Sequence, residues 1–178
     1  MTLRAFVMPG RTVAACAAAC VLSAGLAAAV HAQTPKYGIT VNIDDKKADF
    51  AAIKKYAWQR GQASFDKAID ASIVAAVDDE LAKLGMVKDA PESAQVLVTY
   101  ASTNRTDVDL KGKPDPGGVR PKYQVGTLVV VFLDAKTRNR LLRLRVDQPI
   151  DADPDALQAT IRNVVTQMFE QYPTRQKK

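Results

Sequence analysis

The densest charge in this chain lies between residues 136 and 145, and its residue types suit the binding of anions. The basic side chains in this stretch are Lys136, Arg138, Arg140, Arg143 and Arg145. Guanidinium groups hold carboxylates, phosphates and sulfates through paired N–H donors. On a strand, Arg143 and Arg145 would share one face about 7 Å apart, which suits two anionic groups. The four arginines are therefore a candidate anionic-ligand face; alternatively, their charge protects an edge strand from pairing with another chain.

A second basic group lies in a segment interrupted by proline and glycine. It consists of Lys111, Lys113, Arg120 and Lys122. This segment is a candidate recognition loop, and the order of the strands decides whether it extends the arginine face. Anionic lipid, a glycan or an acidic envelope protein would suit such a surface. Without Arg4 and Arg11 the formal net charge of +6 falls to +4, too low to predict a nucleic-acid partner.

Two acidic groups suggest metal binding or acid–base chemistry. Asp151, Asp153 and Asp155 alternate as in a calcium loop, but Ala156 replaces the required glycine and Arg162 the closing glutamate. We therefore expect these carboxylates to serve a helix start, where negative charge is favoured. The second group, residues 78–80, has the sequence Asp-Asp-Glu on an expected helix, where neighbours point apart. It is predicted to be a solvated face.

The thiols and the imidazole all lie near the N-terminus. Cys16, Cys20 and His31 fall within or just after an apolar, alanine-rich run that follows Arg4 and Arg11. The pattern predicts a cleaved secretory signal peptide over residues 1–32, with the cut between Ala32 and Gln33. The alternatives are an uncleaved membrane anchor and an outer-membrane lipoprotein lipidated at Cys20.

Removal of that segment would leave a periplasmic protein, residues 33–178, without cysteine or histidine. We then expect no catalytic Cys or His, no zinc or other metal site built on them, and no cofactor. Membrane contact would be peripheral at most. An enzyme that uses two carboxyl groups about 5 to 9 Å apart, such as a glycan hydrolase, remains an alternative.

The elements that would position these residues follow from apolar periodicity. Alternation predicts strands at residues 39–43, 94–102, 123–134 and 140–146, and a short strand around Tyr56 and Trp58. The aromatic pair could form a ligand platform, but we expect it to pack in the core. Helical spacing predicts helices over 64–84, closed by Gly85, and from Pro154 to Pro173. Residues 104–122 form the longest expected loop.

These elements give the order ββαβββα in a single α+β domain with its core over about residues 39–173. We expect a largely antiparallel sheet of about five strands with both helices on one face. The last two predicted strands, 123–134 and 140–146, are joined by residues 135–139 and are predicted to form a hairpin. In its second strand Leu142 and Leu144 would face the core, and Arg143 and Arg145 the solvent or a partner.

Several stretches of the chain resemble one known family. They are Asp49-Phe50, Tyr56-Ala57-Trp58, "DDELAKLG", "VLVTY", "YQVGTLVVVFLDAKT" and a last helix that ends in Tyr-Pro. Together they resemble the bacterial envelope family of domains of unknown function called DUF4136. The resemblance implies an exported, often lipid-anchored, small α+β domain with no established catalytic residues. Family members usually have a turn glycine and a strand tryptophan where this chain has Arg138 and Leu142.

The sequence thus predicts an exported, non-catalytic envelope domain that binds or scaffolds through its basic strand and loop. Besides the two-carboxylate hydrolase, a structural module that pairs with itself or with another envelope protein is an alternative.

Overall fold

Two helices and six strands make up the part of the chain that the computed structural model describes, residues 37–64, 66–150 and 153–176. The elements are β1 (Gly38–Ile43), β2 (Lys55–Trp58), α1 (Lys67–Lys83), β3 (Val87–Lys88), β4 (Val96–Val108), β5 (Lys122–Asp134), β6 (Arg140–Pro149) and α2 (Pro154–Glu170). The predicted signal peptide, with Cys16, Cys20, His31 and the Ala32–Gln33 cleavage site, lies outside the described residues, as does Asp151. Neither described helix has the length and apolarity needed to cross a bilayer.

The strands form one mixed sheet in the order β1-β6-β5-β4-β2-β3. From β1 through β6 and β5 to β4, each strand is antiparallel to its neighbour in the sheet. Strand β2 runs parallel to both of its neighbours, β4 and β3. The α+β class is confirmed, but the expected five-stranded, largely antiparallel sheet is wrong in detail. Helix α1 connects β2 to the strands that follow it, and a helical crossover returns the chain in the same direction.

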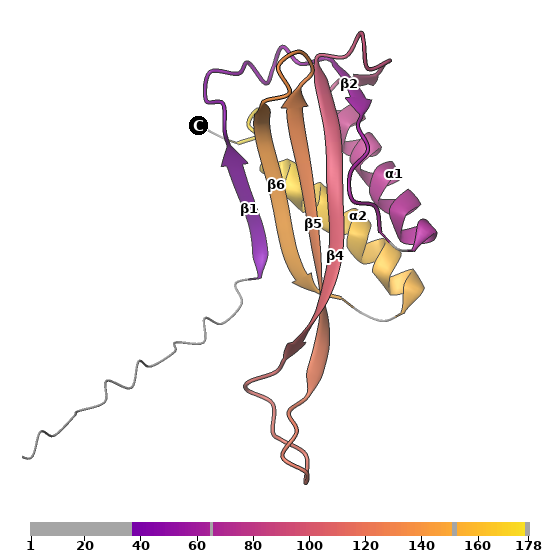
Figure 1. Ribbon diagram of the computed structural model, residues 1–178, viewed down its shortest axis with the longest axis vertical. Coiled ribbons are helices and arrows are strands. Elements are labelled where there is room, and N and C mark those ends of the chain that lie inside the picture. The colour runs from indigo at the N-terminus through magenta and orange to yellow at the C-terminus, as the bar shows by residue number, and fades with distance from the viewer. Residues whose placement is uncertain (1–36, 65, 151–152, 177–178) are drawn as a thin grey trace, which may run out of the picture. The chain divides into compact units, whose positions relative to one another are not determined.

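The hairpin of β4 and β5 is longer than the sequence patterns predict. Its register runs from Val96 opposite Asp134 to Val108 opposite Lys122, so residues 104–108 are strand rather than loop. The segment Asn104-Arg105-Thr106-Asp107 has few apolar residues, which hid its alternation. The proline- and glycine-rich stretch between the two strands is irregular, as expected. Figure 1 shows this hairpin extending beyond the ends of the neighbouring strands.

Both helices cover the same face of the sheet, as the sequence predicts (Figure 1). Helix α1 buries Ile73, Val77 and Leu81, and the apolar side of α2 is buried against β5 and β6. Asp66 caps α1 by accepting hydrogen bonds from the amides of residues 68 and 69, and Gly85 follows the helix with a φ of 76°. The predicted apolar stripes are therefore confirmed, whereas α1 begins three residues later than predicted and α2 ends at Glu170 rather than at Pro173.

A cluster of aromatic rings fills part of the core. Phe132 of β5 packs against both Phe169 and Tyr172, with centroids 6.2 and 5.7 Å away, and the latter two rings stack on each other at 6.3 Å. Phe50 packs edge-on to Tyr172 at 5.8 Å. These rings join the sheet to the end of α2 and to the segment before β2.

The expected solvated face at residues 78–80 is wrong for two of its three carboxylates. Asp78 accepts hydrogen bonds from the Tyr56 hydroxyl and the Trp58 indole N–H, each 2.7 Å long. Glu80 is 1% exposed, and only Asp79 points to solvent. The core-packing expectation holds for Tyr56, which is 3% exposed, while Trp58 is partly buried against the same core. Asp78 therefore fastens α1 to β2.

The β5–β6 turn explains the glycine preference of the family at this position. Arg138 has a φ of 61°, in the left-handed region where a side chain is strained and glycine is favoured. The Arg138 guanidinium donates to the Gln59 side chain at 2.9 Å. Leu142, at the position of the family tryptophan, is fully buried in the core.

Candidate functional site

The second face of the sheet is covered by neither helix, and we call it the open face. Because side chains alternate along each strand, the residues opposite the core-facing set gather here. Its principal members are Thr40, Asn42, Thr99, Ala101, Thr103, Arg105, Asp107, Tyr123, Thr127, Val129, Val131, Leu133, Arg143, Arg145 and Asp147. The face therefore carries an apolar centre on β5 with charged residues on β6 and β4.

Asp147 is the hub of an ion-pair network on this face. It accepts two hydrogen bonds from Arg145, at 2.6 and 2.9 Å, and one from Arg105 at 3.1 Å. The Thr127 hydroxyl donates a further bond of 2.6 Å. The Arg145 hydrogen bonds, followed by those of Thr127 and Arg105, hold the pKa of the Asp147 carboxyl well below its usual value. Arg145 is thus already neutralised within the chain.

The network continues to the segment before β1. Arg105 donates to Asp107 at 3.1 Å, and the Tyr37 hydroxyl donates to the other Asp107 oxygen at 3.0 Å. The hydroxyls of Tyr37 and Tyr123 also contact each other, and their rings meet edge-on at 6.2 Å. These contacts tie the start of β1 to the β4–β5 hairpin.

The four predicted arginines are not equivalent. Arg140 makes a bidentate pair with Asp44, at 2.6 and 2.8 Å, and its hydrogen bonds lower the pKa of that carboxyl. Arg138 bonds Gln59, and Arg145 bonds Asp147. Within the described residues, Arg143 alone of the four has no hydrogen bond or ion pair. The edge-protection hypothesis is wrong, because β6 lies between β1 and β5.

Arg143 is half-buried beside β5, and its charge adds to that of Arg140 in lowering the pKa of the Asp44 carboxyl. In the register it stands between Asn42 on β1 and Val131 on β5. Val129 and Leu133 flank Val131 on the same side of β5, and all three are half-buried. We call Val129, Val131 and Leu133 the apolar strip. The structure thus places one guanidinium, with no hydrogen-bond partner among the described residues, beside an apolar strip.

The basic loop residues do not join this group. Lys111, Lys113 and Arg120 lie on the β4–β5 hairpin tip, at the opposite end of the sheet from the β5–β6 turn (Figure 1). Lys122 is about 23 Å along β5 from Val129, the register partner of Arg145. The Arg120 guanidinium donates to the carbonyls of Leu110 and Gly112, so it stabilises the loop itself.

Sequence patterns missed Arg105, Asp107 and Asp147 as site residues. The first two were assigned to a loop, although their spacing of two residues puts both on one side of a strand. Asp147 follows Arg145 at the same spacing, so the Arg-x-Asp pattern in both strands was the available signal.

Two cavities of the described residues hold one carboxylate between them. One is lined by no carboxylate, and the other by Asp79 alone. No group of three potential metal ligands occurs in the described part of the chain. The two-carboxylate hypothesis therefore finds no support in these cavities.

The model of one protein family, "Domain of unknown function (DUF4136)", matches residues 41–174. The chain belongs to this family. The match spans the DUF4136 domain from β1 to the turn after α2, so it includes the open face and both helices.

Solved structures resemble the DUF4136 domain in fold. One is a PDZ domain protein from Parabacteroides distasonis, with a TM-score of 0.56 and 14% identity over 79% of this chain. This chain spans 36% of that protein's length. Another is a PelC dodecamer from Paraburkholderia phytofirmans, with a TM-score of 0.52, 11% identity and coverage of 79% of this chain and 100% of PelC. No curated protein sequence matches the chain significantly.

Proposed function

We propose that this protein is a non-catalytic binding domain of the bacterial envelope, and that its open face docks an acidic protein surface. The observation that carries the proposal is Arg143, a guanidinium with no hydrogen-bond partner among the described residues, beside the half-buried apolar strip. Arginine and apolar side chains are enriched at the centres of protein interfaces. A carboxylate on the partner would complete the hydrogen bonds of Arg143, and apolar side chains would cover the strip.

The charge arrangement favours an acidic protein over a lipid surface or a glycan. Arg140 and Arg145 already hold Asp44 and Asp147, so the face offers one guanidinium without a hydrogen bond among the described residues, rather than the cluster of cations that draws a domain to anionic lipid. The apolar strip consists of valine and leucine side chains, whereas sugar rings commonly stack on aromatic faces. A folded partner with one carboxylate among apolar residues matches both features.

Site-specific photo-crosslinking of the full chain in cells tests this proposal. Asn42 is exposed and lies opposite Arg143, so a benzoylphenylalanine there reports on what covers the open face. We expect a crosslink to an acidic protein that falls about tenfold with Arg143→Glu, because a charge-assisted bond contributes about 1.5 kcal/mol or more. Arg143→Lys should retain part of it, since only the forked geometry is lost.

A crosslinker at exposed Ala82 of α1 is the matched control and should not capture the same protein. Adducts to lipid or glycan from position 42 would overturn the acidic-protein proposal. Crosslinks between copies of the chain would overturn it too and would instead support self-association, as in the PelC dodecamer. An unchanged crosslink in Arg143→Glu would show that Arg143 does not contribute to partner binding and would overturn its proposed role.

We also propose that the domain is exported and reaches the periplasm as residues 33–178. N-terminal sequencing of the protein from the envelope fraction should begin at Gln33. A lipid-modified product beginning at Cys20 would replace this with the lipoprotein alternative. A product that retains Met1 and stays in the membrane would indicate an uncleaved anchor.

A further inference from the structure

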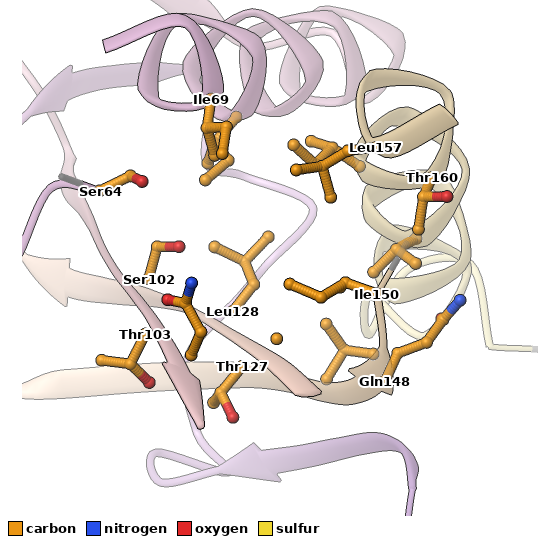
Figure 2. A pocket seen from close by; sticks show the side chains of 16 residues that line it. Ser64, Ile69, Ser102, Thr103, Thr127, Leu128, Gln148, Ile150, Leu157 and Thr160 are labelled. Atoms are coloured by element: carbon orange, nitrogen blue, oxygen red, sulfur yellow. The ribbon is translucent and has the colours of Figure 1, made fainter. Parts of the chain in front are cut away.

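A cavity of about 80 Å³ opens on the helix-covered side of the sheet, opposite the open face. It lies where the first turns of α1 and α2 approach β4, β5 and β6, and Figure 2 shows Ile69 and Leu157 facing Leu128 and Ile150 across it. Its apolar lining consists of Ile69, Ile73, Leu128, Val146, Ile150, Leu157, Ile161 and Val164. The docking function proposed for the open face does not use this cavity.

A glycine of β5, Gly126, lines the cavity. Gly126 lies in register between Asn104 on β4 and Gln148 on β6, on the side that faces the helices. The next residues of β5 on this face, Leu128 and Val130, fill the core. A Cβ on residue 126 would lie 2.9 Å from Cγ2 of Ile150. Glycine thus lets Ile150 pack close to β5, where its side chain forms one wall of the cavity.

The described rim of the cavity is polar. Ser102, Asn104, Gln148 and Thr160 contribute hydroxyl and amide groups, and none of the described residues that line the cavity is charged. None of these four side chains hydrogen-bonds to another described residue, so each is available to a ligand. Figure 2 labels Ser102, Gln148 and Thr160 among the side chains at the edge of the cavity.

We propose that this cavity binds the hydrocarbon end of a neutral amphiphile. The apolar lining disfavours water, since cavities lined by aliphatic groups stay dry and take up apolar molecules. The volume is about half that of a cavity of ~150 Å³ that binds benzene, so it admits the end of a chain rather than a whole lipid. The amides of Asn104 and Gln148 would bond an uncharged hydroxyl or carbonyl at the rim. An ionised head group would meet no opposite charge among the described lining residues and would lose hydration.

Methyl NMR of the folded protein tests this inference, with 1-hexanol as the probe and hexanoate as its charged counterpart. Hexanol should shift the methyl signals of Ile69, Leu128 and Leu157 in a saturable way, and hexanoate should bind more than tenfold more weakly at neutral pH. Ser102→Leu, which fills the cavity from β4, should abolish saturable hexanol binding. Thr40→Leu places the same side chain on the exposed opposite face and should leave binding unchanged.

Thr160→Leu fills the space from α2 and provides a second test if Ser102→Leu does not fold. Non-saturable shifts, equal binding of hexanoate, or unchanged binding in a folded filling variant would each overturn the inference. These measurements do not involve Arg143, so their outcome is independent of the function proposed for the open face.

Discussion

Arg175→Ala is expected to lower the free energy of unfolding by about 3 kcal/mol, because it leaves a buried carboxylate without the less exposed of its two cationic partners. The Glu80 side chain is 2% exposed and accepts a 2.7 Å bond from the Arg175 guanidinium. The Thr166 hydroxyl donates a second bond of 2.9 Å from α2. Glu80 thus joins α1, α2 and the C-terminal segment. Urea denaturation followed by circular dichroism measures the change.

Lys83→Ala provides the matched control, since Lys83 also bonds Glu80, at 2.8 Å, but its side chain is 59% exposed. Exposed ion pairs contribute about 0 to 1 kcal/mol, so this variant should remain near the parent protein. Equal losses in the two variants would show that burial does not decide the strength of these contacts.

Acidification should reduce the difference in the free energy of unfolding between the Arg175→Ala variant and the parent protein. Burial alone raises the pKa of the Glu80 carboxyl, but hydrogen bonds from Lys83, Arg175 and Thr166 outweigh it and lower the pKa below its usual 4.5. A lowered pKa in the folded state stabilises the protein above the unfolded-state pKa, and this contribution disappears as the pH falls through the folded-state value. Urea unfolding curves of both proteins between neutral and acidic pH test whether this difference decreases as the pH falls.

Local patterns in the sequence sufficed for the helices and most strands. The spacing of Ile73, Val77 and Leu81 placed α1, and Asp66 and Gly85 marked its ends. The parallel pairing of β2 with β4 was missed, because the short strand around Tyr56 gives no sign of its direction. The strand–helix–strand order did contain that information, since such crossovers favour parallel neighbours.

Long-range partners explain why the arginine face was only partly predicted. Arg140 pairs with Asp44, which is 96 positions away along the chain, and only the β1–β6 pairing brings them together. The same pairing moves β6 from the expected edge into the sheet interior. Periodicity predicts the face of the sheet on which Arg143 lies. The ion pairs that neutralise Arg140 and Arg145 depend on how the strands align, which periodicity does not give. The cavity beside Gly126 could not be predicted for the same reason, because it depends on the alignment of Asn104, Gly126 and Gln148 on three strands.

Phe132→Ala is expected to lower the free energy of unfolding by about 3 to 5 kcal/mol, the usual cost of removing a buried aromatic ring. Phe132 is fully buried near the C-terminal end of β5 and contacts both Phe169 and Tyr172. Its loss would leave a void where the sheet meets the end of α2, and neighbouring rings are too rigid to fill it. Thermal or urea unfolding of the purified domain measures the change.

Val131→Ala tests the opposite side of the same strand. Val131 is half-buried on the open face, so its truncation should cost about 1 kcal/mol or less if this face is solvated in the purified protein. A loss as large as that of Phe132→Ala would contradict this expectation. Such a loss would indicate that another copy or a co-purified partner already covers the apolar strip.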